Sequence, residues 1–175
     1  MPAEAADDEH GSAQSAMRFH VLAIPHTVTS KEFSTCAYTQ KVLDWCRMMA
    51  PGGHTIIHYG HEDSRVECTE HVTVMTRDVI RAHYGDFDLR TELFRHEPGV
   101  DARFTENAVR EIGARRRPHD FLLCFWGLGH KPVADAFGDL LVVEPGIGTN
   151  ASFAPFRVFE FAVGGDERPL PTQAL

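Results

Sequence analysis

Three short segments combine glycine or proline with side chains that can move a proton or form charged hydrogen bonds. They read "PHTVT" (25–29), "WGLGHK" (126–131) and "EPGIGTN" (144–150), and each directly follows an apolar run. Glycine lacks a side chain and lets backbone amides approach a ligand closely, although glycine and proline also simply form turns. Besides His26, the ligand-binding candidates are Thr27, Thr29, Gly127, Gly129, His130, Lys131, Glu144, Gly146 and Gly148.

A further polar group lies in the segment "HYGHEDSRVECTEH" (58–71). Zinc binds histidine, cysteine and carboxylate side chains, so His58, His61, Cys68 and His71 are candidate ligands of a metal-dependent hydrolase. No CxxC or HExxH spacing supports that hypothesis. The run 61–63 has an alternative use, which is hydrogen bonding to a polyhydroxylated ligand.

Hydrophobic patterns predict the elements that must position these residues. Apolar runs predict strands over 18–24, 54–60, 71–75, 120–127 and 139–148, and helical periodicity predicts helices over 35–49, 76–85 and 105–117. Thr76 and Thr105 are suitable capping residues for the last two helices. The segment "HKPVADAF" (130–137) predicts only one or two helical turns.

This order of elements predicts an α/β fold with a single, mainly parallel sheet and helices on both faces. Ligands of such sheets bind beyond the carboxyl ends of the strands, which share one edge. We therefore expect His26, His130, Lys131 and Glu144 to lie close together.

Composition restricts the kinds of partner that the protein can have. The net charge of −8 argues against a nucleic-acid backbone, and the basic run 115–117 complements the end of a predicted helix. No apolar run approaches the roughly 20 residues that span a bilayer. Four cysteines without paired spacing predict free thiols and a cytoplasmic location.

Several blocks of the chain together resemble bacterial and phage glycosyltransferases of the GT-B architecture. The blocks are "HVLAIPHTVTSKEFSTCAYTQKVLDWCRMM", "GHTIIHYGHEDSRVECTEHVTV", "DFLLCFWGLGHKPVAD" and "LLVVEPGIG…SFAPFRVFEF", within residues 18–161. Composition predicts a disordered acidic tail over 1–16 and a Gly/Pro-rich tail over 164–175. The resemblance implies a Rossmann-like domain between them, at 17–163. It also implies transfer of a sugar from a nucleotide-sugar co-substrate to a hydroxylated acceptor, without an obligatory metal or other cofactor.

The chain has room for one such domain, so the resemblance implies the acceptor-binding half, completed by a second, donor-binding domain or subunit. Its catalytic candidates are His26, Glu62 and Asp63, and Glu144 ranks after them as a further candidate. Histidine suits the removal of the acceptor's proton because its pKa lies near neutrality. Two alternatives stay open, which are a sugar- or nucleotide-binding module without catalysis and the metal-dependent hydrolase described above.

Overall fold

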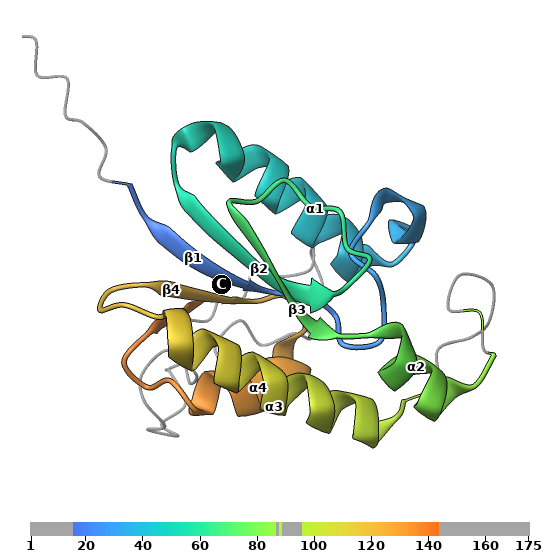
Figure 1. Ribbon diagram of the computed structural model, residues 1–175. Coiled ribbons are helices and arrows are strands. Elements are labelled where there is room, and N and C mark those ends of the chain that lie inside the picture. Colours follow the sequence, from blue (N-terminus) through green and yellow to red (C-terminus); the bar gives the residue numbers. More distant parts are fainter. Residues whose placement is uncertain (1–15, 87, 89–95, 144–175) are drawn as a thin grey trace, which may run out of the picture.

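The described part of the chain is organised around one parallel β-sheet. The structure, a computed structural model, describes residues 16–86, 88 and 96–143. The strands are β1 (Arg18–Leu22), β2 (Thr55–His61), β3 (Glu70–Met75), β4 (Phe121–Cys124) and β5 (Leu141–Val143). They are arranged in the order β3-β2-β1-β4-β5, and every pair of neighbours is parallel (Figure 1).

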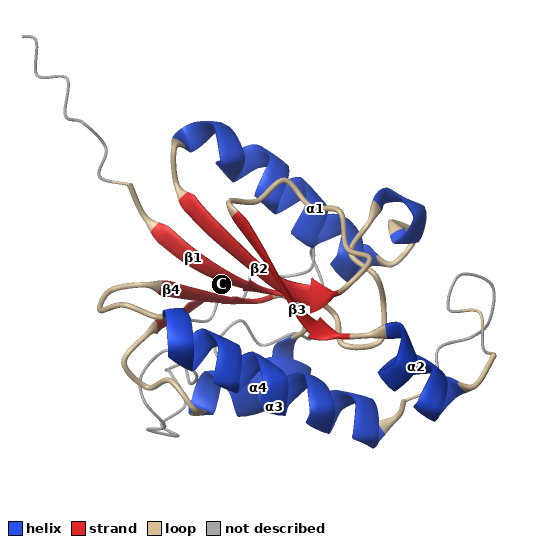
Figure 2. Cartoon of the chain, viewed as in Figure 1, coloured by secondary structure: helices blue, strands red, loops and turns tan. Residues whose placement is uncertain are grey.

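Helices cover both faces of this sheet. They are α1 (Ala37–Met49), α2 (Arg77–Tyr84), α3 (Pro98–Arg115) and α4 (Gly127–Asp135), with short 3-10 helices at Lys31–Phe33 and Ala50–Gly52. Helix α1 lies on one face, and α3 and α4 lie on the other (Figure 2). The predicted α/β, Rossmann-like fold is therefore confirmed. None of the helices in the described ranges is both long and apolar enough to cross a membrane.

The structure corrects two local predictions, at Thr105 and in the segment after β4. Thr105 does not cap α3, because the helix already begins at Pro98, and proline suits a first helical position. The glycine-containing segment after β4 forms a nine-residue helix, α4, rather than one or two turns. Strand β5 is an edge strand of the described sheet, where Leu141 and Val143 stay 49% and 38% exposed.

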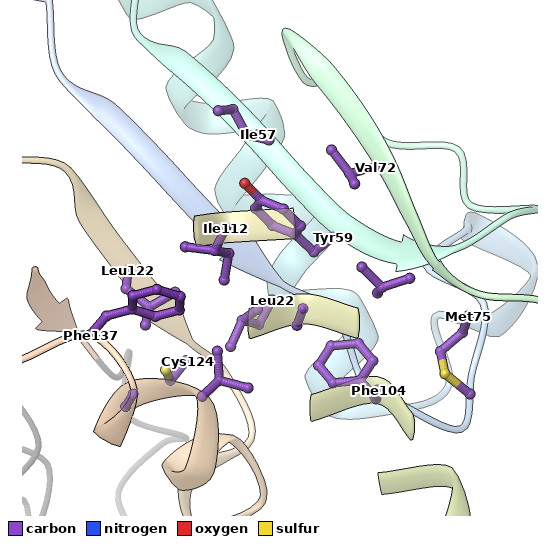
Figure 3. Close-up of a cluster of buried hydrophobic side chains, with 14 of the residues drawn as sticks. Leu22, Ile57, Tyr59, Val72, Met75, Phe104, Ile112, Leu122, Cys124 and Phe137 are labelled. Atoms are coloured by element: carbon purple, nitrogen blue, oxygen red, sulfur yellow. The ribbon is translucent and has the colours of Figure 1, made fainter. Parts of the chain in front are cut away.

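Alternation along the strands creates two hydrophobic cores, one on each face. Successive strand residues point to opposite faces, so Leu22 packs with Tyr59 and Phe104 in the cluster beneath α3 and α4 (Figure 3). Val21 packs with Val42 in the cluster beneath α1. All four cysteines are free thiols, as their spacing predicts.

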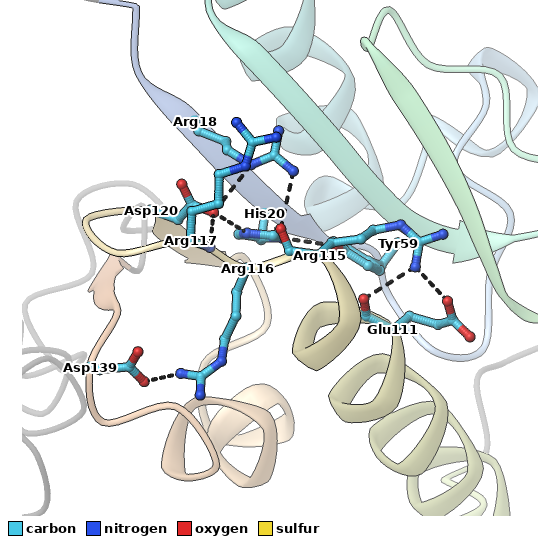
Figure 4. Close-up of polar contacts among 9 residues, drawn as sticks. All are labelled: Arg18, His20, Tyr59, Glu111, Arg115, Arg116, Arg117, Asp120 and Asp139. Atoms are coloured by element: carbon cyan, nitrogen blue, oxygen red, sulfur yellow. Dashed lines mark hydrogen bonds and ion pairs between the residues drawn. The ribbon is translucent and has the colours of Figure 1, made fainter.

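A buried polar chain joins the three central strands. His20 of β1 is fully buried, with Nδ1 2.7 Å from the Tyr59 hydroxyl oxygen and Nε2 2.8 Å from Asp120 Oδ2 (Figure 4). Burial lowers the pKa of His20, so the ring is neutral at neutral pH. Because a carboxylate only accepts, Nε2 carries the hydrogen, and the Tyr59 hydroxyl donates to Nδ1.

Asp120 is the centre of this chain because one of its carboxylate oxygens accepts from three groups. Oδ2 also receives the Arg18 Nε–H at 3.2 Å and the Arg117 backbone N–H at 2.8 Å. The latter bond closes the turn before β4, in which His119 adopts a left-handed φ of 70°. The turn and the network thus position each other.

Replacing Tyr59 by Phe tests this chain. The variant leaves the buried Nδ1 of His20 without its donor, and we expect the free energy of unfolding to fall by about 1–3 kcal/mol. Urea denaturation followed by circular dichroism measures the loss. Tyr38→Phe is the control, since it deletes the same hydroxyl from a partly exposed helix position with no described partner. Equal midpoints for the two variants would contradict the role given to Tyr59.

Candidate functional site

A pocket of about 510 Å³ lies at the carboxyl edge of the sheet. Its walls come from the loop after β1, from the end of β2 and from α2, which follows β3 directly. The lining residues are His26, Val28, His61, Asp63, Arg77, Asp78, Ile80, Arg81 and Gly85. This is the edge where ligands of parallel α/β sheets bind.

Two glycines allow the chain to form these walls. A side chain at Gly60 would place its Cβ 2.5 Å from the ring of His58, so only glycine fits where β2 shifts register against β3 before His61. Gly85 ends α2 with a φ of 66°, a conformation that other residues rarely adopt. The pocket thus depends on backbone positions that tolerate no ordinary side chain.

His26 is the half-buried histidine of the pocket. Its ring meets Trp126, the residue just before α4, edge to face with 5.6 Å between ring centroids. Burial, with a smaller contribution from His96, lowers the pKa of His26 to about 4. At neutral pH the ring is therefore uncharged and can accept a proton. The exits of β1 and β4 meet here, as the sequence predicts.

His61 ends β2 and is only 5% exposed. Its Nδ1 accepts the backbone N–H of Asp63 at 3.1 Å, so the ring hydrogen lies on Nε2 when the ring is neutral. Burial outweighs the nearby acids and lowers the pKa of His61. The ring is thus an oriented hydrogen-bond donor at neutral pH.

Glu62 and Asp63, two catalytic candidates, are both engaged by Arg77. The Asp63 carboxylate pairs with the Arg77 guanidinium through contacts of 2.6 and 2.5 Å, and Glu62 Oε1 accepts the Arg77 backbone N–H at 2.8 Å. Hydrogen bonding from Arg77 lowers the pKa of Asp63. Asp63 therefore lines the pocket as an ionised, paired group, and Glu62 holds the beginning of α2.

The two threonine candidates lie in the loop after β1 and are buried. The backbone of Thr29 donates to Ser64 Oγ at 3.2 Å and accepts from the Arg65 backbone at 2.9 Å. Thr27 is 5% exposed, and its backbone closes a turn onto Ile24. Both residues shape the wall that carries His26, and neither is among the residues that line the pocket.

The structure gives the candidates after β4 a different environment from the expected one. His130 lies in α4, fully buried and stacked on Phe104; its Nε2 lies 3.0 Å from the Ala23 carbonyl oxygen, and its Nδ1 accepts the Trp126 backbone N–H. Lys131 forms an ion pair with Asp135, one turn further along α4.

His130 therefore connects α4 to the end of β1 and presents no surface to a ligand. Gly127 and Gly129 also belong to α4 rather than to a loop. The remaining candidates, Glu144, Gly146 and Gly148, lie outside the described residues.

The four candidate ligands of the metal-dependent hydrolase do not come together in one metal site among the described residues. His58 and His71 stack with their Nδ1 atoms 3.0 Å apart, and burial lowers the pKa of both rings. Within the described ranges, the only group of three potential ligands with atoms within 4.8 Å of one another is His61, Glu62 and Asp63. There the Arg77 cation already occupies the carboxylate of Asp63.

Sequence reasoning missed the contribution of α2 to the pocket. Arg77, Asp78 and Arg81 line one wall, yet the segment 76–85 was predicted only as a helix. The signal was present only in part, because "TRD" at 76–78 follows a strand exit as "PHT" does but contains neither glycine nor proline. The rule that selected His26 requires glycine or proline beside the polar side chain, and it therefore passed over Arg77.

No protein-family model, no curated protein and no solved structure matches the chain. The class of protein is thus defined by its own geometry, which is a Rossmann-like α/β domain with a pocket at the carboxyl edge of its sheet.

The burial of His130 predicts a pH dependence of stability. Its pKa falls from 6.5 to about 4 on folding, so the unfolded chain takes up a proton between pH 6.5 and 4 that the folded chain refuses. Stability is therefore highest above pH 6.5 and falls on acidification. We expect His130 alone to make the free energy of unfolding about 2 kcal/mol lower at pH 5 than at pH 7.

Urea unfolding at the two pH values measures this cost. The side chain of the His130→Gln variant cannot take up the proton. The difference in its free energy of unfolding between pH 7 and pH 5 should therefore be smaller by about 2 kcal/mol. The control His119→Asn alters an exposed histidine, and asparagine tolerates its left-handed backbone. An unchanged pH difference in His130→Gln would show that His130 does not resist protonation.

Proposed function

We propose that this chain is the acceptor-binding half of a GT-B type glycosyltransferase, which transfers a sugar from a nucleotide-sugar donor to a hydroxylated acceptor. The observation that carries the proposal is the pocket at the carboxyl edge, where an uncharged histidine, His26, lies beside two arginines and two acids. Such a site can accept hydrogen bonds from hydroxyl groups and donate hydrogen bonds to them. The block resemblance supports the same assignment.

His26 is the proposed base of an inverting reaction. The acceptor hydroxyl loses its proton to the imidazole while its oxygen bonds to the anomeric carbon, and the bond from that carbon to the donor phosphate breaks. The nucleotide leaves with the electron pair. A pKa of about 4 keeps His26 unprotonated but makes it a weak base. The negative phosphates of a bound donor would raise that pKa toward neutrality.

A retaining reaction would use His26 differently, to orient the donor sugar. In either case the donor would bind to a second Rossmann-like domain or subunit, as the resemblance implies. The principal alternative is a sugar-binding module without catalysis. It is favoured by one observation, since the ion pair with Arg77 removes Asp63 as a free base.

A turnover assay tests the proposal directly. Nucleotide sugars are incubated with the chain and acceptor candidates, with and without a donor-binding domain, and the released nucleotide is measured. We expect His26→Ala to lower turnover by about 10²–10⁴, while His119→Asn, at the opposite edge of the sheet, leaves it unchanged.

A change below threefold would remove His26 from the role of base. Binding of an acceptor without turnover, in all combinations, would leave only the binding module. Circular dichroism of His26→Ala establishes whether a loss of turnover reflects chemistry rather than unfolding.

A further inference from the structure

Two arginines of α2 line the pocket, and the described residues neutralise only one of them. The Arg77 guanidinium is held by both carboxylate oxygens of Asp63. Arg81 lies one helical turn further along, and its guanidinium is exposed, with no hydrogen bond or ion pair to any described residue. The Arg81 guanidinium is thus a cationic group of the pocket that is available to a ligand.

A second donor at the same pocket is fixed in direction. The Nδ1 of His61 is used by the Asp63 backbone N–H, which places the ring hydrogen on Nε2. Nε2 has no hydrogen-bond partner among the described residues, although His61 is only 5% exposed and lines the pocket. The Nε2–H group is thus a fixed donor at the pocket, available to a water or a ligand.

The two acids of the pocket differ in their surroundings, and only Asp63 forms an ion pair with a described residue. Asp63 is paired with Arg77, as described above. Asp78 lies in the first turn of α2, where the helix dipole favours a negative charge. A metal ion at the run 61–63 would have to displace the Arg77 guanidinium, whereas an anion would find Arg81 and the Nε2–H of His61 available.

We propose that this pocket is an oxyanion-binding subsite, with Arg81 and His61 as the direct ligands of a carboxylate or phosphate group. Arg77 acts as a positioning residue, because its ion pair with Asp63 joins α2 to the end of β2. If the proposed transferase function holds, on which this part rests, the acceptor is an acidic sugar or a sugar phosphate. The anion binding itself does not depend on turnover.

Nuclear magnetic resonance titration of the isotope-labelled chain tests the subsite with three probes: glucose 6-phosphate, glucuronate and glucose. We expect an anionic sugar to shift the backbone amide resonances around Arg81 and His61. Its Kd should be at least threefold lower than that of glucose. Binding of glucose 6-phosphate alone would identify a phosphate site, and binding of glucuronate alone a carboxylate site. Equal binding of all three, or of glucose only, would overturn the proposal.

A pair of charge-matched variants shows whether the contact is specific. Arg81→Gln should raise the Kd of the anionic sugar about three- to tenfold, because it removes a charge-assisted hydrogen bond at a partly solvated position. Arg47→Gln on α1 removes an equal charge from an exposed position away from the pocket, and should change the Kd less than twofold.

Equal effects of the two substitutions would reduce the interaction to general electrostatics and overturn the subsite. Failure here and failure of the proposed function are distinguishable. A chain that binds glucose but no anionic sugar loses the subsite and keeps the transferase proposal, whereas a chain that binds anions through Arg81 but never supports turnover keeps only the subsite.

Discussion

The side-chain hydrogen bonds from Tyr59 to His20 and from His20 to Asp120 cross the three central strands of the sheet (Figure 4). Each of these groups is nearly or fully buried, so none can turn to water if its partner moves. A slip of one residue in β1 would turn His20 to the opposite face and leave the Asp120 carboxylate without its ring donor. The polar chain therefore sets the register of β2, β1 and β4. That register in turn determines which loops meet at the other edge of the sheet.

The polar groups at the two edges of the sheet differ in whether they have hydrogen-bond partners. At the amino edge, three donors converge on one oxygen of Asp120, and the arrangement is closed to ligands. At the carboxyl edge, the Arg81 guanidinium and His61 Nε2 have no described partner. A buried, fully paired network stabilises one arrangement of the core, whereas groups without partners beside a pocket are available for binding. This contrast, rather than the residue types, separates the structural histidine His20 from the candidate site.

Much of the fold was predictable because it follows from local patterns. The strand before His26 and the helix capped by Thr76 appear where periodicity and capping place them. The site was predictable only in part, since parallel strands bring His26 and the end of β2 to one edge. The environment of His130 was not, because glycines at 127 and 129 suggested a loop while tertiary packing made a helix. Sequence shows that a histidine is present, but only the packing of Phe104 and the Ala23 carbonyl shows that it is enclosed.

Burial also determines what kind of chemistry the pocket can offer. Burial lowers the pKa of six histidines, at positions 20, 26, 58, 61, 71 and 130, so their rings are neutral in the folded state near neutral pH. The two histidines of the pocket therefore act through directed hydrogen bonds and proton acceptance rather than through charge. Attraction of a charged ligand must come from α2, whose Arg77 is already neutralised by Asp63. The same burial that stabilises the sheet thus makes Arg81 the charged group on which the proposed anion subsite depends.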